Sequence, residues 1–212
     1  MSALVITGTD TDVGKTVVAS ALAGAIAGAC YWKPIQAGLA DGTDRDRVKV
    51  LSGLSEERLL PEAYRLTTPA SPHLAARLDR AEIDLAYLTL PELPEPLIVE
   101  GAGGVLVPVN PVQTMADLFS MWGVPVLLVA RTSLGTINHS LLSVEALRAR
   151  GVEVGGIIFS GDADVENERI IPRMAGVPHL GRLPRLDPLN HATLAQAVRD
   201  HLDLAAIERL LA

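Results

Sequence analysis

A glycine-rich stretch near the start of the sequence contains the residue types that hold phosphate groups. It runs from Gly8 to Thr16, reads GTDTDVGKT, and lies between an apolar segment and an Ala-rich one. Glycines let backbone N–H groups curl round an anion, a helix N-terminus adds partial positive charge, and a lysine placed like Lys15 reaches the outer phosphates. The Thr16 hydroxyl can ligate Mg²⁺. The spacing from Gly8 to Gly14 is one residue longer than in the common pattern, yet the sequence predicts a phosphate-binding loop.

Glu100 is the second residue suited to this chemistry. It ends the apolar run LIVE at residues 97–100 and is followed by the cluster Gly-Ala-Gly-Gly. A carboxylate at the end of a buried strand can bind a metal or act as an acid, although a solvated strand end would look the same. A magnesium nucleotide needs several hard oxygen ligands and Thr16 supplies one, which favours a metal-binding role for Glu100.

Lys33 follows a short apolar stretch and precedes Pro34 and a turn that ends at Gly38. At the end of a strand its ammonium would point into a ligand crevice, whereas an ordinary surface lysine is the alternative. Two lysines converging on a transferring phosphoryl group would stabilise its charge. Lys33 is therefore a candidate partner of Lys15.

Two predicted helix starts leave both a structural and a functional interpretation open. Asp44 and Asp46 begin one of these helices, where acidic residues also cap the helix and complement its dipole. Asn138 begins another, and the N–H groups there are able to hold a carboxylate. A plain helix start explains either pattern equally well.

The elements that must position these residues follow from hydrophobic patterning. Continuous apolar runs of strand length occupy residues 4–7, 97–100, 124–130 and 154–159. Helix-length segments occupy residues 15–29, 44–53, 114–122, 138–150, 165–175 and 192–211. Continuous rather than alternating apolar strands indicate a mostly parallel α/β sheet covered by helices on both faces, with ligands at the carboxyl ends of its strands.

Composition excludes several classes of protein. The 212 residues include 18 Lys+Arg and 25 Asp+Glu, a net charge of −7, and 49% are hydrophobic. These values favour a single globular domain of residues 1–212 over a disordered chain, and the acidic balance argues against nucleic acid as a partner. A single cysteine and no secretory signal favour the cytoplasm. Residues 16–32 carry no charge but are rich in Ala and Gly, which indicates a packed helix rather than a membrane span.

Several blocks of sequence resemble the dethiobiotin synthetase family and occur in that family's order. They are GTDTDVGKT at 8–16, KP at 33–34 with Gly38, SPH at 71–73, VEGAGG at 99–104 and LGTINH at 134–139. The resemblance implies a P-loop NTPase-like fold and a homodimer. It also implies a biotin-pathway ligase that closes a ureido ring on 7,8-diaminopelargonic acid, using CO2 and a nucleoside triphosphate such as ATP with Mg²⁺. The implied reaction passes through a carbamate and a carbamic-phosphoric anhydride, without a covalent enzyme intermediate.

The resemblance also implies roles for individual residues. Lys15 and Lys33 are expected to be catalytic, and Thr16, Asp46 and Glu100 are expected to hold Mg²⁺. The nucleotide is expected to contact Asp12, Val13, Gly14, Lys15, Thr16, Val17, Asp46, Glu100, Gly101, Ala102, Gly103, Ser160, Gly161, Pro184, Arg185 and Leu186. The diamine is expected to contact Thr11, Lys33, Ala37, Gly103 and Asn138, the last near a dimer interface.

Two positions depart from the family pattern. Ala37 stands where many members have Ser or Thr, which removes one hydroxyl contact, and Ser160 stands where better-known members have an Asn that pairs with adenine. A Ser hydroxyl cannot reproduce the donor and acceptor of an amide, so the preferred base stays open.

The main alternative function is that of a switch or partitioning ATPase, which shares the phosphate loop and does not ligate. Such proteins carry an extra lysine near the start of that loop, and residues 8–13 contain none. A small-molecule kinase is a further alternative, which a dependence of phosphate release on CO2 would distinguish.

Overall fold

A six-stranded parallel sheet forms the centre of the protein, whose computed structural model describes residues 2–212. Its strands are β1 (Ala3–Gly8), β2 (Cys30–Trp32), β5 (Leu97–Gly104), β6 (Val126–Arg131), β7 (Val154–Ser160) and β8 (His179–Leu183). They lie in the order β2-β5-β1-β6-β7-β8, and every neighbouring pair is parallel. A separate parallel pair joins β3 (Ile35–Ala37) and β4 (Tyr64–Leu66).

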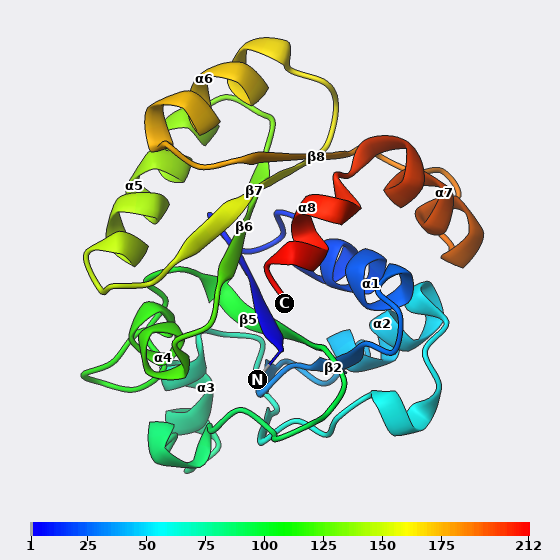
Figure 1. The fold of residues 1–212 in the computed structure, drawn as a ribbon. Coiled ribbons are helices and arrows are strands. Elements are labelled where there is room, and N and C mark those ends of the chain that lie inside the picture. Colours follow the sequence, from blue (N-terminus) through cyan, green and yellow to red (C-terminus); the bar gives the residue numbers. More distant parts are fainter. Residues whose placement is uncertain (1) are drawn as a thin grey trace.

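Helices cover both faces of this sheet (Figure 1). One face packs against α1 (Lys15–Ala25), α2 (Asp44–Ser52), α7 (His191–His201) and α8 (Leu204–Arg209). The other packs against α3 (Pro72–Leu78), α4 (Met115–Trp122), α5 (Thr136–Arg148) and α6 (Val165–Ala175). Short 3-10 turns occupy Glu56–Arg58 and Leu85–Tyr87. The expected α/β fold is confirmed.

Two cores explain why the strands read as unbroken apolar runs. Along β1, Leu4 and Ile6 face the α1 side while Val5 faces the α5 side, and all three are fully buried. Neither face meets water, so both sets of alternating positions must be apolar.

The carboxyl ends of the central strands come together at one edge. Ile6 pairs with Glu100, and Gly8 pairs with both Gly104 and Val129. The connection after β1 therefore emerges beside the polar end of β5, where an open parallel sheet binds its ligands.

Some elements differ from the sequence-based expectation. The single helix predicted for residues 192–211 is wrong, because the chain turns at Leu202 and starts again at α8. Asp203 causes the restart: its carboxylate accepts a hydrogen bond from the N–H of Ala206, while its own N–H donates to Leu180 O at 3.0 Å. β8 and α3 were not predicted at all.

The uncharged stretch at 16–32 contributes α1, a short connection and β2, and its small side chains allow close packing. None of the helices within residues 2–212 combines the length and apolar character needed to cross a membrane. Gly24 lies against the backbone of Ser52, where an added Cβ would be 2.8 Å from the carbonyl oxygen. A glycine is required for this close approach of α1 and α2.

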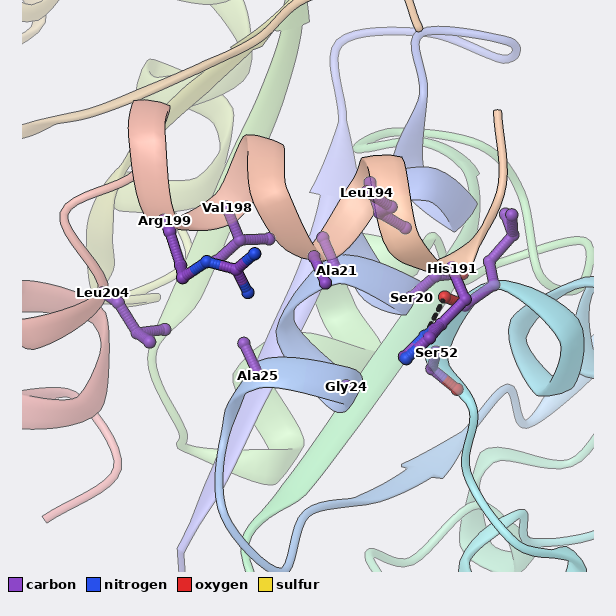
Figure 2. A pocket seen from close by; sticks show the side chains of 12 residues that line it. Ser20, Ala21, Gly24, Ala25, Ser52, His191, Leu194, Val198, Arg199 and Leu204 are labelled. Carbon is purple, nitrogen blue, oxygen red and sulfur yellow. Dashed lines mark hydrogen bonds between the residues drawn. The ribbon is translucent and has the colours of Figure 1, made fainter. Parts of the chain in front are cut away.

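A hollow of about 280 Å³ lies where α7 crosses α1 and α2 (Figure 2). Its walls are mostly small or apolar, with His191 and Arg199 at its margin. The ring Nδ1 of His191 lies 3.1 Å from Leu51 O, which fixes the start of α7 on the end of α2. The hollow lies along the second half of α1, residues 20–25, and none of its lining residues belongs to the phosphate loop.

Replacing Gly24 by Ala tests the close approach of the two helices. An alanine in a helix normally stabilises by up to about 1 kcal/mol relative to glycine. Here we expect the opposite sign, a loss of about 1 to 3 kcal/mol, because the new methyl group overlaps Ser52 O. Urea unfolding of Gly24→Ala measures the change, and a variant more stable than the parent would contradict the proposed contact.

Candidate functional site

The loop between β1 and α1 has the backbone shape of an anion cradle. Asp12 and Gly14 both have positive φ, 57° and 99°, which turns the chain back before α1 begins at Lys15. An added Cβ on Gly14 would lie 2.5 Å from Ser160 Oγ, so only glycine fits between this loop and the end of β7. Gly14 also has no side chain to cap α1, which leaves the first N–H groups free for a ligand.

Lys15 extends from the first residue of α1 across this loop. Its ammonium donates to Asp10 O at 2.8 Å, and the residue is only 7% exposed. Burial lowers the pKa of Lys15, an effect that Glu100 partly opposes. A desolvated ammonium held inside a loop of N–H groups is suited to a phosphate group.

Three oxygen-bearing side chains meet beside the loop. Thr16 Oγ1 lies 2.8 Å from Glu100 Oε1 and 3.0 Å from Asp44 Oδ1. They come from α1, β5 and α2, which the sheet register and the packing of α2 on α1 bring together.

The ammonium of Lys33 binds both carboxylates of this cluster. It donates to Glu100 Oε1 at 3.0 Å and to Asp44 Oδ2. Burial disfavours the charge on Lys33, but the two carboxylates outweigh that effect and raise its pKa. Burial likewise disfavours ionised Asp44, whereas Lys33 and the Thr16 hydroxyl lower the pKa of that carboxyl below its usual value. The lysine and Asp44 therefore both carry charge at neutral pH.

Tyr31 holds the far oxygen of Glu100. Its hydroxyl donates to Glu100 Oε2 at 2.8 Å, and the tyrosine is fully buried. Burial and the adjacent carboxylate raise the pKa of Tyr31 well above its usual value, so it remains a donor. Glu100, itself 1% exposed, is thereby fixed in position.

Asp46, which is expected to hold Mg²⁺, makes no hydrogen bond to this cluster in the structure, and its role as a ligand stays a prediction. Its carboxylate accepts from the N–H of Thr43 at 3.0 Å, while the Thr43 hydroxyl accepts from the N–H of Asp46 at 3.1 Å. This reciprocal pair is a capping box that starts α2. Asp44, two residues earlier, is the acid of this helix start that contacts Thr16 and Lys33.

A cavity of about 860 Å³ opens over the cluster and collects most of the predicted residues. Those that line it are Thr11, Asp12, Gly14, Lys15, Thr16, Val17, Lys33, Ala37, Glu100, Ala102 and Gly103. They include both lysines, Lys15 and Lys33. Of the oxygen cluster, Thr16 and Glu100 were predicted as site residues, whereas Asp44, which also lines the cavity, was not.

Other predicted residues lie outside the lining of this cavity. Val13 is in the core, and Gly101 faces Phe119, whose ring would lie 2.8 Å from an added Cβ. Ser160 is the last residue of β7 and Gly161 follows it. Residues 184–186 follow β8, where Arg185 Nε lies 3.6 Å from Asp162 Oδ2. Asn138 is exposed on the first turn of α5.

Sequence reasoning missed three residues that shape the site. Tyr31 gave no signal in an apolar stretch, whereas Asp44 was indicated only as one of two acids at a helix start. The pattern Thr43-x-x-Asp46 would have separated them, because it is typical of a capping box and occupies Asp46. Gln36 was also missed: its Oε1 accepts from the N–H of Asp44 at 3.2 Å and so orients the start of α2.

A parallel sheet with a glycine-bent loop, lysine and threonine at the start of α1 defines a phosphate-loop NTPase. The family model described as "AAA domain" matches residues 2–193. The fold is similar to the cell division ATPase MinD of Pyrococcus furiosus, with a TM-score of 0.55 and 14% identity over 99% of this chain and 100% of that one. A ParA family ATPase from Chlorobium tepidum gives 0.51 and 11% over 100% and 98%. At these identities the likeness shows the fold alone.

Sequence relatives identify the family within this class. The ATP-dependent dethiobiotin synthetase BioD of Nitrobacter hamburgensis is 61% identical over 93% of this chain and 92% of its own length. Those of Rhizorhabdus wittichii and Brucella anthropi are 59% and 54% identical, over 92% and 94% of this chain and 93% and 94% of their own lengths. This chain belongs to the ATP-dependent dethiobiotin synthetase family. The expected ATP-dependent ligase class is confirmed, and the switch ATPases are related to it only distantly, through their fold.

Proposed function

We propose that this chain closes the ureido ring of dethiobiotin from 7,8-diaminopelargonic acid and CO2, with conversion of ATP to ADP and phosphate. One observation carries the proposal: the two buried lysines, Lys15 and Lys33, line one cavity together with the phosphate loop. Such a site is suited to a reaction in which positioning and charge stabilisation do most of the work.

The proposed reaction has three steps. One substrate amine attacks CO2 and loses a proton, which gives a carbamate. A carbamate oxygen then bonds to the γ-phosphorus of ATP while the bond to ADP breaks. The second amine attacks the carbonyl carbon of the resulting anhydride and loses a proton, the bond from that carbon to the phosphate oxygen breaks, and the ring closes with release of phosphate. Lys15 would stabilise charge on the outer phosphates and Lys33 charge on the carbamate and the transferring group.

Mg²⁺ suits the oxygen cluster because Thr16, Asp44 and Glu100 bring hard oxygen donors together in the cavity. The Thr16 hydroxyl has one proton for two carboxylate oxygens that both lie within 3.0 Å of it. Hard oxygen donors of this kind prefer Mg²⁺, so we assign Thr16, Asp44 and Glu100 as its protein ligands. When bound, the ion would neutralise charge on the triphosphate. No cluster of three or more His, Cys, Asp or Glu side chains suited to a metal occurs within residues 2–212, and this set depends on the threonine.

Substrate contacts follow from the same cavity. We assign Thr11, Ala37 and Gly103 to the diamine, because they line the same cavity as Lys33. The loops after β7 and β8, with Ser160, Gly161, Pro184, Arg185 and Leu186, would contact the nucleoside. Ser160 lies against Gly14, which supports a place next to the phosphates.

We propose that residues 1–212 form a single domain and that a second copy of the chain completes the site. Exposed apolar side chains occur just before α5 and in its first two turns: Leu134 is 100% exposed, Ile137 37% and Leu142 55%. Contiguous exposed apolar groups are typical of interfaces. Because Asn138 lies among them and outside the cavity, we propose that it serves the diamine carboxylate across a homodimer interface.

The function is tested by phosphate release from the purified chain. We expect release to require both diaminopelargonic acid and bicarbonate and to yield the cyclic urea by mass. Parallel reactions with ATP, CTP and GTP rank the bases that the Ser160 side of the site accepts. Release that is indifferent to both additions would contradict the ligase function.

Replacing Lys33 by Met should lower turnover at least about a hundredfold, because charge on the transferring group loses its stabilising ammonium. ATP binding, measured by titration, should change much less. Retained ATP binding would also show that the variant is folded. Lys49→Met removes an exposed lysine of α2, which pairs with Glu56 at 2.7 Å, and serves as a matched control. Near-normal turnover of Lys33→Met would remove this lysine from the mechanism.

Asp44→Asn and Asp46→Asn separate the two candidate metal ligands. We expect Asp44→Asn to raise the Mg²⁺ concentration needed for half-maximal phosphate release. Asp46→Asn should leave that concentration near the parent value and cost about 0.3 to 1.5 kcal/mol of unfolding free energy, because it disturbs the capping box. A raised Mg²⁺ requirement in the Asp46 variant alone would restore that residue as the ligand.

Leu134→Asp places a charge in the proposed interface. Light scattering should show a dimer for the parent and a shift towards monomer for the variant, with a raised KM for the diamine. Val50→Asp changes a side chain that is 72% exposed on α2, at the opposite face of the sheet, and should leave both unchanged. A parent protein that is monomeric at working concentrations would refute the shared site.

A further inference from the structure

Arg47 is a charged residue of the active-site cavity that the proposed mechanism does not use. It lies on α2 one helical turn after Asp44 and lines the cavity together with Thr16 and Val17. Its backbone N–H bonds to Thr43 O as part of the helix, whereas its side chain is exposed towards the cavity.

The guanidinium of Arg47 has no partner within residues 2–212, where it forms neither a hydrogen bond nor an ion pair. The other basic side chains of α2 are engaged outside the cavity. Arg45 binds Glu56 and donates to Leu59 O at 2.9 Å, and Lys49 also binds Glu56. Arg47 is thus the basic group of this helix that is available to a ligand.

The cavity lacks free positive charge without this residue. Its basic side chains are Lys15, Lys33 and Arg47, against the acidic Asp12, Asp41, Asp44 and Glu100. Lys33 is already bound by two of those carboxylates, and Lys15 donates to Asp10 O. A triphosphate entering a cavity with more acidic than basic groups needs a further unpaired cation, and an arginine can offer a phosphate two parallel N–H donors.

The position of Arg47 points to the phosphates rather than to the diamine. The helices α1 and α2 run side by side in the same direction, since Thr16 contacts Asp44 at one end and Gly24 approaches Ser52 at the other. One turn beyond Asp44, Arg47 is therefore level with the first turn of α1 beyond Thr16, where Val17 lines the cavity.

We propose that Arg47 is a positioning residue that binds phosphate oxygens of the nucleotide along the first turn of α1. This inference rests on the proposed function only in that ATP binds at the phosphate loop. The ligand class is an oligophosphate, and the residue acts on its affinity and placement rather than on the ring closure.

The test is a set of direct titrations of the intact protein with ATP and with inorganic triphosphate, each with Mg²⁺. Arg47→Met keeps an unbranched, flexible side chain and removes the guanidinium charge. Arg47→Lys restores a cation, and Lys49→Met is the matched control on the same helix. Circular dichroism checks that each variant is folded. Loss of a charge-assisted hydrogen bond should weaken binding of both ligands about tenfold to hundredfold in Arg47→Met. Arg47→Lys should recover part of this loss, and the Kd of the Lys49 variant should equal that of the parent.

Three results would overturn the inference. One is an unchanged Kd for both ligands in Arg47→Met. Another is weaker ATP binding with unchanged binding of inorganic triphosphate, which would place Arg47 on the nucleoside. The third is a raised KM for diaminopelargonic acid with unchanged ATP binding. If the parent binds ATP but forms no cyclic urea, the proposed function fails, while the titrations still decide the role of Arg47.

Discussion

A carboxylate buried within a central strand, that of Glu100 in β5, governs the arrangement of this site. Glu100 has almost no contact with solvent, and a buried charge of this kind is costly unless every oxygen is bonded. Thr16, Tyr31 and Lys33 meet that requirement from three different parts of the chain. Because they all bind one rigid strand, the loop, the second strand and the lysine turn have fixed positions relative to each other.

The start of α2 is fixed by a second set of bonds, which orients Asp44. The capping box between Thr43 and Asp46 defines where the helix begins, and Gln36 binds the first N–H of that helix. A carboxylate at the first helical position also lies in the favourable field of the helix dipole. Asp44 is therefore preorganised to meet Lys33 and Thr16 without any contact to Glu100 itself.

Local signals in the sequence predicted the parts of the site that depend on neighbouring residues. The stretch from Gly8 to Thr16 contains the whole loop, and the apolar run before Glu100 identified its strand. Asp44 was harder, since two acids at one helix start are equivalent until the cap of that helix is known. β8 was missed because its sequence HLGRL is short, is only partly buried and lacks an apolar run. Arg47 carried no signal, because its meaning depends on which neighbours leave it unpaired.

The strand order also determines when this site can exist during synthesis. β5 lies between β1 and β2, so the first two strands of the sheet never touch each other directly. Thr16 and Glu100 are 84 positions apart, and a nascent chain has no means of closing the oxygen cluster before residue 100 is free of the ribosome. Contacts so distant in sequence form slowly, because a long loop must close first. An N-terminal fragment that ends before β5 would contain the whole phosphate-loop sequence but lack Glu100 and the strands on which the loop rests.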